Sequence, residues 1–130
     1  MDVNSSNYQK LAERTSATAS NEGRDACLDR LGHREIRLLH GAMGLCTEAG
    51  EFQDALKRYI FYGSDLDVSN LKEECGDIAW YLAEIMNALG LSFEDVLRLN
   101  CEKLRRRYPE KFTNIDAVNR DLEAERKVFE

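Results

Sequence analysis

The chain has 130 residues, of which 43% are apolar and 32% charged, and its formal net charge is −6. A chain of this length forms one domain with a small hydrophobic core, and small cores are often completed by oligomerisation. The negative charge argues against a nucleic-acid binder, because affinity for a phosphate backbone comes from Lys and Arg side chains. It remains compatible with a small charged ligand.

The sequence also indicates where the protein works. No apolar run approaches the roughly 20 residues that a membrane span needs, and the first residues, MDVNSSNYQK, lack the basic and then apolar pattern of a signal peptide. We therefore expect a cytoplasmic protein that binds neither membranes nor nucleic acid. Its four cysteines lack the spacings of a zinc site, which predicts reduced, mostly buried thiols. They are Cys27, Cys46, Cys75 and Cys101.

The chain contains one proline and almost no alternating apolar pattern, so we predict an all-α protein. A first helix fits NYQKLAERT, residues 7–15. The stretch SATASNEGRDACLDRLG, residues 16–32, is rich in Ser, Thr, Asn and Gly, which predicts a flexible connection. A second helix is predicted from His33 or Arg34 to Phe61, because apolar residues recur there at helical spacing. They are Leu38, Leu45, Ala49, Phe52, Leu56 and Tyr59.

Cap signals divide the rest of the chain. After YGSDLDVSN, Ser69 or Asn70 is predicted to cap a third helix over 71–89, which Gly90 ends. The fourth helix is predicted to begin after Ser92, with Glu94 and Asp95 in its first turn, and to run to Tyr108 before Pro109. The tail IDAVNRDLEAERKVFE is helix-prone but highly charged. We expect one domain over 1–130, with a core at about 8–112 and an extension at 113–130.

An acidic motif occurs twice. GLCTEAGEFQDALKR places Glu48 and Glu51 three residues apart, and LKEECGDIAWYLAEI repeats this spacing with Glu74 and Asp77. On a helical wheel Glu48 and Glu74 lie about 50° to 60° from the centres of their apolar stripes. Both predicted helices therefore place acid at the margin of the surface that they bury.

Buried like charges cost several kcal/mol unless protons, cations or hydrogen bonds compensate them. Clustered carboxylates are hard oxygen ligands of the kind that Mg²⁺ and Mn²⁺ prefer, whereas zinc favours His and Cys. Gly50 and Gly76 directly precede the second acid of each pair. Each glycine costs its helix about 1 kcal/mol relative to Ala, which is explained if the backbones approach closely or leave space for a ligand. The alternative is that all four acids lie on solvated helix faces.

These residues resemble the MazG-like branch of the all-α nucleoside triphosphate pyrophosphatases, whose pattern is E-x-x-E, a spacer and E-x-x-D. YQKLAERT, GLCTEAGE, EECGDIAWYL and NCEKLRRRYPEKF are also similar to the family, so the resemblance covers about Tyr8 to Phe112. Thr47 departs from it, because many members carry another glutamate there. Residues 16–32 have no clear counterpart.

The resemblance implies hydrolysis of a nucleoside triphosphate between the α and β phosphates, for control of a nucleotide pool. It makes Glu48, Glu51, Glu74 and Asp77 catalytic ligands of Mg²⁺, for which Mn²⁺ substitutes, and leaves open which acid is the general base. It also implies five substrate contacts on the third and fourth helices. Tyr81 would contact the base, and the phosphate or sugar contacts would be Asn100, Lys103, Arg107 and Tyr108.

Several alternatives stay open at this point. The basic residues of the fourth helix could instead lie on a solvated helix end, where the helix dipole favours them. Tyr81 could pack in the core instead of contacting the base, and Trp80 could fill an interface. We expect a homotetramer, with a dimer as the alternative, and single out dGTP among other dNTPs only because guanine offers two donors. The rival functions are a metal-binding or structural helical oligomer and a regulatory protein partner. The basic fourth helix favours the enzyme.

Overall fold

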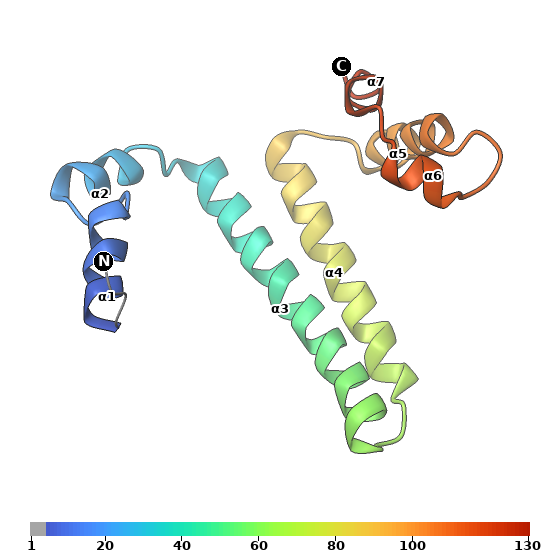
Figure 1. The fold of residues 1–130 in the computed structure, drawn as a ribbon, viewed down its shortest axis with the longest axis horizontal. Helices are drawn as coiled ribbons and strands as arrows, with labels where there is room; N and C mark the ends of the chain where they lie inside the picture. The colour runs from blue at the N-terminus through green and yellow to red at the C-terminus, as the bar shows by residue number, and fades with distance from the viewer. Residues whose placement is uncertain (1–4) are drawn as a thin grey trace.

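The structure is a computed structural model that describes residues 5–130, and helices and loops make up all of this part (Figure 1). The all-α prediction is confirmed. The helices are α1 Ser5–Thr15, α2 Asn21–Leu28, α3 His33–Tyr62, α4 Val68–Leu89, α5 Phe93–Arg107, α6 Asn114–Val118 and α7 Leu122–Arg126.

The long helices α3 and α4 pack side by side as an antiparallel hairpin. Gly63, at φ 70°, ends α3, and Gly90, at φ 67°, ends α4 as predicted, because both adopt the left-handed conformation that glycine accepts without strain. At the open end of the hairpin, Arg37 donates to both oxygens of Glu84 at 2.7 and 2.9 Å. In Figure 1, α1 and α2 lie on the α3 side of the hairpin, and α5 to α7 lie on the α4 side.

The start of α4 differs from the prediction. Asp67 is the N-cap, and its carboxylate accepts from the Asn70 backbone N–H at 3.0 Å. Ser69 and Asn70, the predicted caps, therefore lie inside the first turn. Asp is as good an N-cap as Ser or Asn, so sequence alone did not separate the three positions.

Residues 16–32 also depart from prediction, because α2 forms within them. Ser20 caps this helix by accepting from the Gly23 N–H at 3.0 Å, and Glu22 lies favourably in its first turn. The predicted flexible connection is therefore wrong over 21–28. The fourth predicted helix is confirmed as α5, where Ser92 accepts from the Asp95 N–H at 3.3 Å.

Two glycines allow α3 and α4 to approach closely, and neither is a predicted one. A Cβ at Gly41 would lie 2.6 Å from Ile85 Cγ1, and one at Gly44 would overlap the Tyr81 ring. A Cβ at Gly50 or Gly76 would meet no atom within 4 Å. The prediction of close approach at Gly50 and Gly76 is therefore wrong within this chain, while the space beside both glycines remains.

We expect Gly44→Ala to destabilise the fold by about 1 to 3 kcal/mol, because the new methyl group would displace Tyr81 from α3. Gly50→Ala is the matched control in the same helix. It should raise stability by up to about 1 kcal/mol, since Ala favours a helix and meets open space. Chemical denaturation of both variants measures this contrast. A loss of stability in Gly50→Ala would show that another molecule packs there.

The described residues contain very little buried apolar surface. Among residues 5–130, Val128 is the one apolar residue that is buried, with 7% of its surface exposed. The thiols do not follow the prediction either, because Cys27 is half-buried while Cys46, Cys75 and Cys101 are exposed. All four are free, as predicted.

Candidate active site

The antiparallel hairpin brings acids from both motifs together. Glu48 projects from the middle of α3 and meets Glu74 and Asp77, one helical turn apart on α4, so that one oxygen from each lies within 4.8 Å of the others. Glu51, the fourth predicted ligand, is exposed and lies outside this close group. We call Glu48, Glu74 and Asp77 the acid group.

Glu74 occupies an unusual environment for a carboxylate. It is only 5% exposed, and its Oε1 accepts a hydrogen bond of 2.7 Å from Asn70 Nδ2. Its Oε2 is buried and has no hydrogen-bond partner among the described residues. Buried carboxylate oxygens are normally paired because the loss of hydration is costly, so this oxygen is suited to bind a cation.

The electrostatics of Glu48 agree with that conclusion. Burial raises the pKa of its carboxyl, and the charge of Glu51, contact with the Glu74 carboxyl and the charge of Asp77 raise it further. A positive ion among these oxygens would reverse the repulsion. The donor set consists of carboxylates alone, which fits Mg²⁺ or Mn²⁺ rather than zinc.

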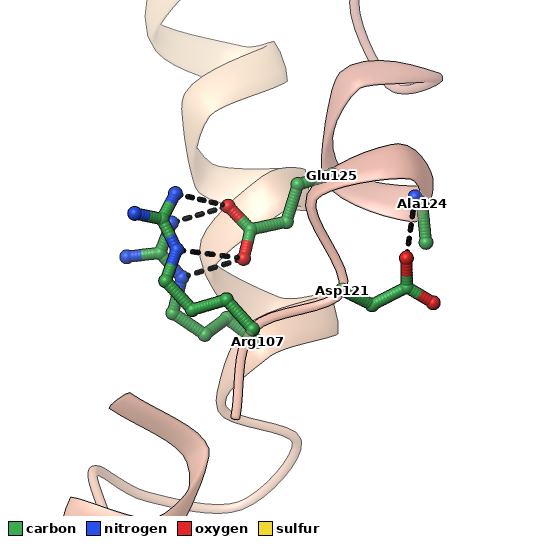
Figure 2. Close-up of polar contacts among 5 residues, drawn as sticks. Arg107, Asp121, Ala124 and Glu125 are labelled. Carbon is green, nitrogen blue, oxygen red and sulfur yellow. Dashed lines mark hydrogen bonds and ion pairs between the residues drawn. The ribbon is translucent and has the colours of Figure 1, made fainter. Parts of the chain in front are cut away.

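The structure places the basic residues of α5 away from the acid group. Arg107 donates through Nε to Glu125 at 2.9 Å and makes a second short contact through Nη2, while Arg120 Nη2 donates to Glu125 at 2.8 Å (Figure 2). Lys103 Nζ lies 5.8 Å from the centre of the Phe129 ring. The C-terminal residues thus cover the face of α5 that was predicted to bind phosphate.

Distance along the hairpin explains this separation. Glu74 is 15 residues from Leu89, the end of α4, which corresponds to about 22 Å of helix. The α5 helix begins beyond that end and packs against α7. Within one chain, the structure therefore assembles the acid group without Lys103 or Arg107.

Comparison with known protein families identifies the family of this chain. The family model for the MazG nucleotide pyrophosphohydrolase domain matches residues 40–112, a range that contains the acid group and all of α5. The chain belongs to this family. The resemblance inferred from the two acidic motifs is confirmed over residues 40–112, and its extension to Tyr8 stays a prediction.

One curated relative extends the comparison. Gene 37 protein of Mycobacterium phage L5 is 33% identical to this MazG chain over 75 residues, which are 54% of the chain and 65% of the relative. The aligned part thus spans slightly less than two thirds of that relative. No solved structure matches the chain. Among the described residues, no helix is long and apolar enough to cross a membrane.

Two aromatic residues predicted to contact substrate, Tyr81 and Tyr108, pack against other parts of the MazG domain. Tyr81 rests against Gly44, and its ring centre is 4.9 Å from that of Trp80 and 5.7 Å from that of His40. Tyr108, at the end of α5, packs against Phe112 with ring centres 5.4 Å apart. Asn100 is half-buried on α5. The substrate contacts assigned to Tyr81, Asn100 and Tyr108 remain predictions.

A hollow of about 530 Å³ lies beside the acid group, at the loop end of the hairpin. Glu51 and Glu74 line one part of it, and Arg58, Ser64 and Asn70 line another. Neither Arg58 nor Asn70 was predicted to lie beside the acids. Asn70 carries a readable signal, because it precedes Glu74 by four residues and so shares its helix face.

The contact at the end of α5 has its own pH dependence. Hydrogen bonds from Arg107 and then Arg120 lower the pKa of Glu125 from 4.5 to about 2. The folded chain therefore holds fewer protons at this site than the unfolded chain. Stabilisation by these ion pairs is fully present above about pH 4.5 and is lost as the pH falls toward 2.

We therefore expect the wild type to unfold at a higher temperature than Glu125→Gln near pH 6. The gap should close as the pH falls from 4.5 to 2, because wild-type Glu125 then becomes protonated and loses its charge. Thermal unfolding of both proteins across this range measures the gap. A gap that stays constant on acidification would contradict the ion-pair assignment.

Proposed function

We propose that this MazG protein hydrolyses a deoxynucleoside or ribonucleoside triphosphate between its α and β phosphates. The products are the nucleoside monophosphate and pyrophosphate. The observation that carries the proposal is the buried, unpartnered oxygen of Glu74 beside Glu48 and Asp77, within the residues that match the pyrophosphohydrolase family. An acid group of this kind has a chemical use if it holds a divalent cation against a polyphosphate.

The ligands we propose are Glu48, Glu51, Glu74 and Asp77, and the ion is Mg²⁺, with Mn²⁺ as a substitute. A bound ion would neutralise phosphate charge and lower the pKa of a water molecule. Glu74 is held in place by its burial and its hydrogen bond from Asn70, whereas Glu51 and Asp77 are exposed and accessible to a ligand. An exposed acid beside the ligands is suited to accept the proton of the attacking water.

We propose that the protein assembles into a homotetramer in the cytoplasm, with a dimer as the alternative. The hairpin of one chain exposes large apolar side chains, among them Met43 at 70% and Trp80 at 55%, which a second copy would cover. Assembly would also allow Lys103 and Arg107 of one copy to approach the acid group of another. Light scattering coupled to size-exclusion chromatography measures the assembly directly.

The base is the least constrained part of the proposal. We propose a role in nucleotide-pool control, with dGTP as the substrate to test first and the other dNTPs and NTPs beside it. Tyr81 is the residue we propose for contact with the base, and Asn100, Lys103, Arg107 and Tyr108 for contact with phosphate or sugar. The deciding experiment measures pyrophosphate release from each triphosphate with Mg²⁺, with Mn²⁺ and with EDTA.

Release that requires the metal ion and stops in EDTA supports the proposal, because the ion would then supply the positive charge at the reacting phosphorus. Full activity in chelator would contradict it. Metal binding without release of pyrophosphate from any triphosphate would favour the alternative, a helical metal-binding or regulatory oligomer.

A further inference from the structure

Asn70 lies at the point where the start of α4 meets the acid group. Its backbone N–H is bound by the Asp67 carboxylate at 3.0 Å, so the N-cap fixes the position of its backbone. Its side chain is half-buried and donates through Nδ2 to Glu74 Oε1 at 2.7 Å. Two hydrogen bonds, from Asn70 to Asp67 and from Asn70 to Glu74, thus connect a helix cap to the most buried acid of the site.

This hydrogen bond acts differently on the two oxygens of Glu74. Oε1 is occupied by the amide, whereas Oε2 is buried and unpartnered among the described residues. Two positions of the carboxylate would otherwise exchange by rotation about its last bond, since terminal sp³–sp² torsions are broad. The amide donor removes this freedom and keeps one oxygen available.

We infer that Asn70 is a positioning residue that orients Glu74 for a divalent cation, an inference that rests on the metal-dependent function proposed above. Groups that hydrogen-bond to metal ligands fix their orientation, and removing such a group typically weakens metal affinity about 10- to 100-fold. Asn70 also lines the hollow beside the acid group. It nevertheless acts through Glu74, because its amide N–H donates to that carboxylate.

The test measures Mn²⁺ binding by calorimetry on the full chain, without nucleotide. Asn70→Leu keeps a similar side-chain volume and removes the donor, so its Mn²⁺ affinity should fall about 10- to 100-fold. Asn70→Gln keeps an amide four residues before Glu74, and its affinity should return close to that of the wild type. Asn87→Leu makes the same substitution at an exposed position of α4 and should leave the affinity unchanged.

Thermal unfolding of the metal-free proteins separates positioning from general stability. All three variants keep the Asp67 cap, because it binds the backbone of residue 70. Asn70→Gln and Asn87→Leu should unfold near the wild-type temperature, whereas Asn70→Leu should unfold at a lower one, because Glu74 Oε1 loses its hydrogen bond. Unchanged Mn²⁺ affinity in Asn70→Leu would overturn the inference and leave the proposed function intact. A loss of affinity that Asn70→Gln does not restore would overturn it too. A wild type that binds no Mn²⁺ would overturn both.

Discussion

Glu74→Gln is expected to reduce pyrophosphate release by at least about a hundredfold, because metal-ion catalysis supplies several kcal/mol and a neutral amide is a poor ligand for Mg²⁺. The metal-free variant should keep or gain thermal stability. Its Oε1 can still accept from Asn70, and its amide can donate toward Glu48 or Asp77 where two carboxylates now repel. Steady-state kinetics and thermal unfolding in EDTA measure the two effects.

Glu73→Gln is the matched control, since it removes the same charge from an exposed neighbour on α4. Its activity should stay close to that of the wild type. If Glu74→Gln instead kept its turnover and lost stability in EDTA, Glu74 would be a structural residue. The opposite directions expected for activity and stability distinguish a strained ligand from an ordinary core residue.

Local signals explain which helices could be predicted. Gly90 and Ser92 mark the end of α4 and the start of α5, and both act as predicted. Gly63, which was not predicted as a stop, ends α3 in the same left-handed conformation as Gly90. α2 was missed because the polar composition of 16–32 outweighed one good cap at Ser20. A composition rule averages over residues, whereas a cap depends on a single side chain.

The acid group was predictable to the extent that it depends on one helix at a time. The i,i+3 spacing placed Glu74 and Asp77 on one face of α4, but their meeting with Glu48 depends on the register of the hairpin. That register also decides which glycines touch the facing helix, and it selects Gly41 and Gly44. A helical wheel contains no information about the neighbouring helix, so these glycines were missed.

The ion-pair partner of Arg107 could not be predicted from the sequence around it. Glu125 follows it by 18 residues, across a loop and α6, and nothing in the periodicity of α5 marks the pair. The consequence is chemical. Arg107 has a phosphate-like carboxylate on its guanidinium in this structure, so a simple loss of activity on its removal has two explanations.

Lys103→Ala and Arg107→Ala are each expected to weaken triphosphate binding by roughly ten- to a hundredfold, the cost of one charge-assisted contact to a phosphate. Metal binding should change less, because the acid group is built from other residues. Arg105→Ala is the control on the same helix, since Arg105 is exposed and lies about 160° around α5 from Arg107. Competition by inorganic pyrophosphate, at saturating Mg²⁺ and low salt, measures the affinities.

The double variant Arg107→Ala/Glu125→Gln resolves the two explanations for Arg107. Arg107→Ala alone leaves Glu125, at 5% exposure, with Arg120 as its remaining cationic partner, so stability should fall. Neutralising Glu125 as well should restore most of that stability. If Arg107 binds phosphate, pyrophosphate affinity stays low in the double variant and is retained in Glu125→Gln alone. Recovery of affinity together with stability would instead show that Arg107 serves only to hold the C-terminal helix on α5.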